Sequence, residues 1–137
     1  MRLWHYKLLP VLPDKFIIAE WRECIAIKRQ WEKGTLKHKL VSYVMDYDKE
    51  YFYNYVLEVV AELLIRGIKY NKKYLIEISN FSKSLTLCEN KSLNYPEHND
   101  RYLRQCYYNL QEKYDRGIIT SAEYNLINKT IGGKIDN

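Results

Sequence analysis

One segment of the sequence, residues 48–66, constrains the fold more than any other. Apolar side chains recur there at helical spacing with no Gly or Pro between them: Phe52, Tyr55, Val56, Val59, Val60, Leu63 and Leu64. Asp46 and Asp48 are candidate N-caps, Arg66 falls in the last turn, and Gly67 follows as a stop signal. A helix this apolar needs other elements to cover it, so the sequence predicts a central core helix.

Most of the remaining chain also has helical patterns. Residues 14–33 carry an apolar stripe at spacings of three, four and seven, with Pro13 before the first turn and Gly34 after the last. Residues 35–45 are ambiguous but favour a short helix, whereas the polar residues 84–96 are predicted to form a loop. Further helices are expected over residues 72–83, 98–115 and 120–131, the last opened by a capping-box pattern. Neither sustained strand alternation nor an internal repeat occurs, so we expect an all-α protein, a single compact helical bundle.

The two ends of the chain are expected to depart from this bundle. Pro10 and Pro13 disfavour a helix before them, so residues 1–12 are predicted to form an extended N-terminal arm. The C-terminal end is expected to form a short helical, hairpin-like tail. The predicted organisation is therefore a helical domain over residues 1–113, with residues 114–137 packed on it or oligomerising from it.

Composition and charge narrow the class of protein. The chain has 137 residues, of which 47% are hydrophobic, and this suffices for one domain with a buried core and argues against disorder. No apolar run approaches the ~20 residues of a membrane helix, and no signal-peptide core is present, so we expect a cytoplasmic protein without a membrane partner. The net charge of +5 is uneven, because residues 1–91 carry 16 basic and 11 acidic groups and the rest carry equal numbers. An anionic partner is therefore expected to meet the N-terminal part.

Motifs for metal binding and nucleophilic catalysis are scarce. His5, His38 and His98 stand far apart and form no ligand-spaced pair, which argues against a zinc or iron site. Neither a Gly-rich phosphate loop nor a nucleophile elbow occurs. Cys24 and Cys106 fall on apolar helix faces, where a core position is favoured over a reactive one. The sequence therefore gives no support for a metal site.

The most informative stretch is Ala19-Glu20-Trp21-Arg22-Glu23-Cys24, in the first predicted helix. Trp21 and Cys24 are expected to point into the core. Arg22 and Glu23 lie roughly 100–200° round the helix from them, on a face with small alanine side chains. Two interpretations remain open from spacing alone. The face is either a solvated one with local Arg–Glu pairs, or a carboxylate beside a cation at the bottom of an anion-binding groove.

The same stretch carries a resemblance to a known family. Residues 18–23 are similar to the A-E-[aromatic]-R-E helix of the pyrimidine-dimer DNA glycosylase family (endonuclease V-like), at the same distance from the N-terminus. Across residues 52–67, the positions that follow the family's central helix without a gap are Glu58, Ala61-Glu62, Leu64 and Arg66-Gly67. Three further stretches resemble a bacterial branch of the family: Met1-Arg2-Leu3-Trp4-His5, Lys37-His38 to Tyr43-Val44, and Tyr95-Pro96-Glu97-His98-Asn99. Together they cover roughly residues 1–113, whereas residues 114–131 resemble a small two-helix oligomerisation-type tail.

This resemblance implies a DNA repair glycosylase with AP-lyase activity on pyrimidine dimers in double-stranded DNA, working without metal or cofactor. In the family, the N-terminal α-amine attacks the deoxyribose carbon that bears the damaged base and forms an imine, after which β-elimination breaks the strand. An α-amine suits this task because more of it is neutral near pH 7 than of a lysine side chain. Here the amine is assigned to Met1, since removal of the methionine is expected to fail before Arg2. The family's essential carboxylate maps onto Glu23, which would stabilise the developing sugar cation and move protons.

The resemblance and the basic charge together predict a set of DNA-contacting residues: Arg2, His5, Arg22, Lys28, Arg29 and Lys33. Trp4, His5 and Tyr6 either stack on bases or dock the arm onto the core, and docking is favoured. His98 is either a cap for the fourth helix or a site residue folded back near the first. The tyrosines of residues 43–55 are interpreted as a packing layer.

A different class of function remains as an alternative. Phe16 and Ala26 occupy first-helix positions at which the family contacts DNA through His and Arg, and the tail is unlike the family's. The chain would then be a non-catalytic DNA-binding or oligomerising protein on the same scaffold, with the tail mediating a homo-oligomer.

Overall fold

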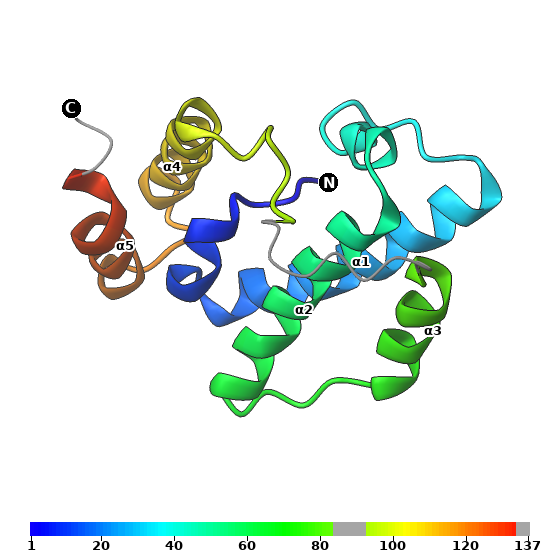
Figure 1. The fold of residues 1–137 in the computed structure, drawn as a ribbon. Helices are drawn as coiled ribbons and strands as arrows, with labels where there is room; N and C mark the ends of the chain where they lie inside the picture. Colours follow the sequence, from blue (N-terminus) through cyan, green and yellow to red (C-terminus); the bar gives the residue numbers. More distant parts are fainter. Residues whose placement is uncertain (84–92, 134–137) are drawn as a thin grey trace.

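Helices form the regular structure of the chain. The computed structural model describes residues 1–83 and 93–133, and within these ranges it contains no β-strand. The elements in chain order are the 3₁₀-helix η1 (Tyr6–Val11), α1 (Asp14–Lys33), the 3₁₀-helix η2 (Ser42–Asp46), α2 (Lys49–Ile65), α3 (Lys72–Ser82), α4 (Asp100–Asp115), α5 (Ser121–Ile127) and the π-helical turn η3 (Asn128–Gly132). The expectation of an all-α bundle is confirmed (Figure 1).

Helix α1 begins and ends at the predicted signals. Pro13 precedes it, Asp14 lies in its first turn near the positive end of the helix dipole, and Gly34 ends it with a φ of 73°. The buried positions run along one stripe: Ile17, Glu20, Trp21, Cys24, Ile27 and Lys28. The expected inward orientation of Trp21 and Cys24 is confirmed. Two of the buried positions carry charged side chains, Glu20 and Lys28, and this places ionisable groups inside the bundle.

The core is centred on α2, which contacts α1, α3 and η1. Five of the seven side chains that predicted this helix are buried within 3% exposure, Val60 is 4% exposed, and Leu64 points outward at 63% exposure. Trp31 of α1 connects the helices, because its ring meets Phe52 of α2 edge-on at 5.9 Å and Phe81 of α3 at 5.3 Å. The central helix predicted over residues 48–66 is therefore confirmed.

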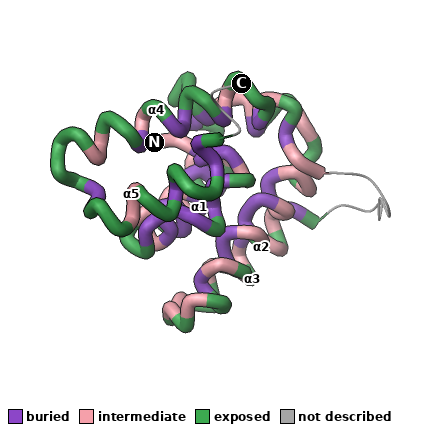
Figure 2. Tube along the Cα trace, turned by 90° about the vertical axis from the view of Figure 1, so that its left-hand side faces the viewer, coloured by how far each residue is buried: buried purple, intermediate pink, exposed green. Residues whose placement is uncertain are grey.

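The N-terminal segment differs from the expected extended arm. Residues 1–5 lack helical structure, but Tyr6–Val11 form η1 with Pro10 inside it. A short 3₁₀-helix tolerates this proline, because the missing N–H removes a single weak backbone hydrogen bond. The neighbouring bonds, from the Leu8 N–H to the His5 carbonyl oxygen and from the Leu12 N–H to the Leu8 carbonyl oxygen, remain. The segment is also buried rather than projecting (Figure 2). The expectation that residues 1–12 are extended is thus wrong for their second half.

The other irregular segments agree in part with expectation. The short helix expected over residues 35–45 is limited to η2 at their end. Of the loop predicted over residues 84–96, residues 84–92 lie outside the described part of the chain, and residues 93–96 are irregular.

The C-terminal helices pack against the N-terminal segment. Helix α5 contacts α4, η3 and η1, so the blue N-terminal segment in Figure 1 lies between the α4–α5 pair and the α1–α2 pair. Thr120 and Glu123 form the predicted capping box at the start of α5. The division into residues 1–113 and 114–137 stays a prediction. No helix in the described ranges is long and apolar enough to cross a membrane.

Candidate active site

The side chain of Glu23 lies against the backbone at the N-terminus. The backbone N–H of Arg2 donates a hydrogen bond to Oε2 of Glu23 at 3.1 Å, and both residues are partly buried. The α-amine of Met1 is three covalent bonds from the Arg2 nitrogen, which places it within about 4 Å of that atom. The α1 carboxylate and the chain's amino end therefore share one location, although 21 residues separate Arg2 from Glu23.

A pocket of about 180 Å³ opens beside this contact. Its lining comes from the N-terminal segment, α1 and α4: Trp4, Phe16, Ala19, Glu20, Glu23 and Lys113. The rings of Trp4 and Phe16 are stacked, with centroids 6.0 Å apart and planes 9° from parallel. Lys113 lies over the Phe16 ring, with its Nζ 5.8 Å from the centroid. The pocket thus combines two carboxyl groups, a flat aromatic wall and a cation.

Glu20 and Lys113 are the charged pocket residues that sequence reasoning missed, and Glu20 is the buried one. Its side chain is 1% exposed, although charged residues are almost never buried without a partner. Burial raises the pKa of Glu20 well above its usual range, and the nearby charge of Glu23 raises it further. The sequence did contain a signal, because Glu20 stands three residues after Ile17 and four before Cys24, inside the apolar stripe.

Side chains from distant parts of the chain hold residues 3–6 in place. The Tyr55 hydroxyl donates to the Trp4 carbonyl oxygen at 2.7 Å, and the Tyr102 hydroxyl donates to the Leu3 carbonyl oxygen. On the next residues, the Tyr6 backbone N–H donates to Nδ1 of His98 at 3.3 Å. These bonds satisfy backbone groups that no helix or sheet would satisfy, so the path of the amino end is specified by tertiary contacts.

A family model described as pyrimidine dimer DNA glycosylase matches residues 1–76, more than half of the chain. The chain belongs to this family. Membership makes it, in broad class, a DNA repair glycosylase whose substrate is DNA. No curated protein and no solved structure matches it.

In this glycosylase, the histidines predicted at the site are buried beneath the N-terminal segment. His5 is 1% exposed and His98 is 6% exposed. Burial lowers the pKa of His5 to about 4, and burial together with the charge of His5 lowers the pKa of His98 to about 3. Because His98 accepts at Nδ1, its Nε2 carries the hydrogen and faces the Tyr43 hydroxyl at 2.7 Å.

These positions change two of the sequence expectations. His5 has no surface with which to contact DNA, and the docking interpretation of the segment is the one that the structure supports. His98 is not the cap of α4, since Asn99 occupies that position and accepts from the Tyr102 backbone N–H. It is folded back under residues 5 and 6 instead.

The basic residues of the glycosylase's first helix divide into accessible and inaccessible ones. Arg22 and Lys33 are exposed, and Arg29 is exposed while its Nε lies 3.4 Å from Glu77 Oε2. Lys28 is 5% exposed, and its Nζ lies 3.1 Å from Glu32 and 3.4 Å from Glu77. The structure therefore does not place Lys28 where a phosphate could reach it, because its position in the apolar stripe turns it inward.

Arg2 is half-buried beside the pocket. Its guanidinium lies 5.6 Å from the centroid of the Trp4 ring, and its Nη1 is 3.9 Å from Sγ of Cys106. Arg2 therefore packs against the Trp4 ring of the aromatic wall. Its expected role in contacting DNA stays a prediction.

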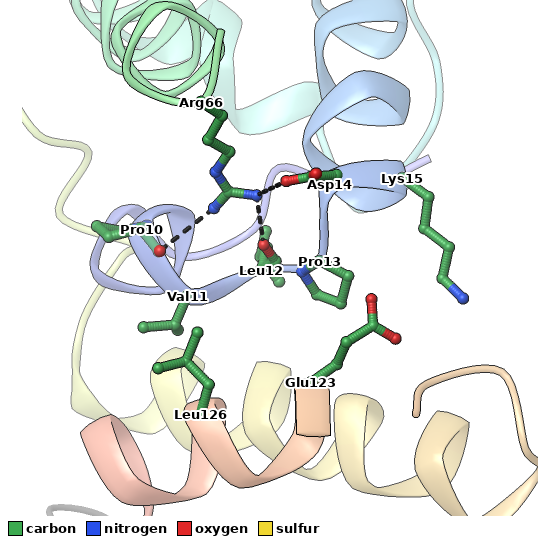
Figure 3. A pocket seen from close by; sticks show the side chains of 9 residues that line it. All are labelled: Pro10, Val11, Leu12, Pro13, Asp14, Lys15, Arg66, Glu123 and Leu126. Atoms are coloured by element: carbon green, nitrogen blue, oxygen red, sulfur yellow. Dashed lines mark hydrogen bonds and ion pairs between the residues drawn. The ribbon is translucent and has the colours of Figure 1, made fainter. Parts of the chain in front are cut away.

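A larger pocket of about 470 Å³ lies elsewhere, between η1, the start of α1 and α5 (Figure 3). Arg66 lines it, but the N–H groups of its guanidinium already donate hydrogen bonds within the protein. Their acceptors are Leu12 O at 2.6 Å, Asp14 Oδ1 at 3.0 Å, Leu9 O at 3.1 Å and Pro10 O at 3.2 Å. Arg66 thus supplies hydrogen bonds to the end of η1, which has few of its own. This pocket lies where η1, α1 and α5 meet, and neither Glu23 nor the amino end lines it.

Metal-binding groups are not assembled in the part of the glycosylase that the structure describes. Among residues 1–83 and 93–133, no group of three or more His, Cys, Asp or Glu side chains could hold a metal ion.

Proposed function

We propose that this family member removes damaged bases, most specifically pyrimidine dimers, from duplex DNA and then cleaves the strand as an AP lyase. The observation that carries the proposal is the 3.1 Å hydrogen bond from the Arg2 backbone to Glu23. It brings the amino end of the chain and the carboxylate that the family resemblance assigns to catalysis together at one pocket. Without this contact, Glu23 would be one half-buried carboxylate among several.

In the proposed reaction, the α-amine of Met1 is the nucleophile. Its nitrogen forms a bond to C1′ of the deoxyribose as the bond from C1′ to the damaged base breaks. Loss of a proton from nitrogen and opening of the sugar ring leave an imine between Met1 and C1′. Removal of a C2′ proton and departure of the 3′ phosphate then break the strand.

Glu23 serves this sequence in two ways. Its negative charge stabilises the cation that develops on the sugar, and its oxygens accept and return protons within the pocket. The stacked rings of Trp4 and Phe16 form an apolar wall beside it. Such a wall excludes water and offers a surface against which a base turned out of the helix can lie.

Accessible cations occur on the two helices that line this pocket, α1 and α4. Arg22, Arg29 and Lys33 lie on the exposed side of α1, and Lys113 of α4 lines the pocket itself. We assign them to phosphate contacts, which supply affinity without reading sequence. Lys113 lies outside the stretch matched by the family model, so its assignment rests on its position at the pocket alone.

Borohydride trapping tests the proposal. The protein is incubated with ultraviolet-irradiated duplex, duplex with an abasic site and undamaged duplex, and sodium borohydride reduces any imine to a stable adduct. We expect adducts with the first two substrates and none with the third. Steep salt-dependent binding to all three without an adduct would instead identify the non-catalytic DNA-binding alternative.

The C-terminal tail is proposed to set the oligomeric state, as its resemblance suggests. Its helix α5 contacts η1 of the same chain, so the deletion of residues 114–137 is best judged by solution mass together with a thermal melt. A stable deletion variant with the same number of subunits as the full chain would show that the tail does not set the oligomeric state.

A further inference from the structure

Glu20 occupies an unusual position for a carboxyl group. It lines the same pocket as Glu23, one turn earlier on α1, and is 1% exposed. Among the described residues it forms no ion pair with a lysine or arginine, although Lys113 lines the pocket too. A buried carboxyl without a cation is costly, so a residue that served only to fill this space would be better as Leu or Gln.

The contacts of Glu20 lead to the amino end of the chain. The Tyr55 hydroxyl lies 3.2 Å from Oε1 of Glu20 and 2.7 Å from the Trp4 carbonyl oxygen. The Trp4 backbone and the Glu23 side chain also lie close enough to Glu20 to affect its pKa, which the former lowers and the latter raises. Glu20 therefore contacts both components of the proposed chemistry, the N-terminal backbone through Trp4 and the carboxylate of Glu23.

The hydrogens in this group can be counted. Tyr55 has one hydroxyl hydrogen and two oxygens near it, and two facing carboxylates would have no hydrogen between them. A neutral Glu20 adds the missing hydrogen, because Tyr55 then donates to the Trp4 carbonyl oxygen while the Glu20 hydroxyl donates either to Tyr55 or to Glu23. The raised pKa of Glu20, caused first by burial and next by Glu23, agrees with this count.

None of the interactions that most affect the pKa of Glu20 comes from a cation. Cys24 of α1, Tyr55 of α2 and Tyr43 of η2 are acids whose pKa burial raises, so they are neutral partners. Glu23 of α1 is the near negative charge and Lys113 of α4 the cation of the pocket. Ionisation of Glu20 would thus set a second negative charge against Glu23.

We propose that Glu20 is a positioning residue of the glycosylase site, which with Tyr55 fixes the Trp4 backbone and the Glu23 carboxylate so that the amine and Glu23 meet the same sugar. The proposal rests on the proposed function. It assigns Glu20 no contact with the reacting atoms, and it makes the neutral side chain the working form. Two consequences follow. A glutamine at position 20 should retain the function of the neutral carboxyl near pH 7, whereas an apolar side chain of similar size should not.

The test compares Glu20→Gln with Glu20→Leu, and Glu58→Leu is the control. Glu58 is a half-buried carboxyl of α2 that lines a different pocket, so its loss should leave trapping unchanged. With abasic duplex and borohydride, we expect Glu20→Gln to trap within about threefold of the wild-type rate and Glu20→Leu to fall by about 10–100-fold, the effect of misplaced groups. Thermal melts confirm that both variants are folded. In the pH profile, we expect the wild-type rate to fall on the alkaline side as Glu20 ionises, and Glu20→Gln to lose this fall.

A second readout keeps the positioning claim separate from the activity. The backbone amide resonances of Arg2 and Trp4 should shift in Glu20→Leu and return towards wild-type positions in Glu20→Gln. A folded Glu20→Leu variant that traps at the wild-type rate, or whose Arg2 and Trp4 resonances do not move, would overturn the proposal. Absence of trapping by the wild-type protein would overturn the proposed function instead, and the resonances would still decide whether Glu20 positions the segment.

Discussion

The backbone N–H of Arg2 donates to the carboxylate of Glu23 at 3.1 Å, and this bond joins the amino end of the chain to the middle of α1. Tyr102 and Tyr55 donate hydrogen bonds to the carbonyl oxygens of Leu3 and Trp4, so the segment cannot leave α1 without breaking several bonds together. Side chains of the bundle core thus hold the amino end beside Glu23, as the proposed terminal-amine mechanism requires. The predictions below depend on this arrangement.

Replacement of Glu23 by Gln should remove catalysis while leaving the fold intact. The amide oxygen still accepts the Arg2 N–H, but the side chain has neither the charge nor the proton affinity of a carboxylate. We expect strand cleavage of irradiated duplex to fall by about 10²–10⁴-fold, the usual contribution of a general acid or base. Gel-shift affinity should change by less than about threefold. Cleavage at the wild-type rate would remove Glu23 from the mechanism.

Replacement of Arg66 by Met should destabilise the N-terminal segment. The aliphatic stem is retained, but five carbonyl or carboxylate partners, Glu62 among them, lose their donor. We expect the free energy of unfolding in urea to fall by about 2–4 kcal/mol, since bonds to a charged group contribute roughly 1.5–3 kcal/mol each and do not add fully. The matched control is Arg116→Met on α4, whose exposed pair with Glu112 should be worth less than about 1 kcal/mol. Equal losses in the two variants would show that the Arg66 bonds contribute no more than a surface pair.

Stability should fall in acid because two buried histidines are neutral in the fold. The pKa of His5 is lowered to about 4, against about 6.5 in an unfolded chain, so the unfolded state binds more protons between these values. Its stabilising effect is therefore complete above pH 6.5 and is lost as the pH falls towards 4. The loss is on the order of 3 kcal/mol for His5.

The matching variant is His5→Asn, whose side-chain oxygen can still accept from the Lys7 N–H as His5 Nδ1 does. Urea unfolding at pH 7 and pH 4.5 gives the stability difference for each protein. We expect a smaller stability difference in the variant, because it lacks the imidazole of His5. The carboxylates that titrate in the same pH range are common to both proteins, so their effect cancels in the comparison. Identical differences would show that His5 is not a source of the acid sensitivity.

The first helix offers a paired test of DNA contacts. Arg22 is exposed, whereas Lys28 is buried between Glu32 and Glu77. Arg22→Gln should lower the slope of log K against log salt by about 0.9, which corresponds to one phosphate contact. Lys28→Met should leave that slope unchanged and lower the free energy of unfolding by about 1–2 kcal/mol. A lower slope for Lys28→Met would mean that this side chain turns outward on DNA.

Helices could be predicted from the sequence where local signals agree. The periodicity of residues 48–66 and the pairing of Pro13 with Gly34 placed α2 and α1 within a residue or two. The extended arm was predicted wrongly because Pro10 was treated as excluding any helix, whereas its cost in a short 3₁₀ turn is one bond. Local rules also sent Lys28 to the surface, although its spacing from Cys24 placed it in the apolar stripe.

The site was only partly within reach of the sequence. Glu23 could be proposed from its motif, but its contact with Arg2 depends on how residues 1–5 cross α1, and no local pattern encodes that path. Tyr55 was expected to pack, and it does, yet its hydroxyl also fixes the Trp4 carbonyl across 51 residues. Glu20 was not among the predicted site residues, although its spacing from Ile17 and Cys24 places it in the apolar stripe.

The most direct test of the account is the location of the covalent adduct. After borohydride trapping on abasic duplex, the protein is digested and the modified peptide is sequenced by mass spectrometry. The account predicts a reduced sugar adduct on the α-amine of Met1, and no adduct after that amine has been selectively blocked. An adduct on the side chain of Lys113 or another lysine, or full trapping by the blocked protein, would contradict it.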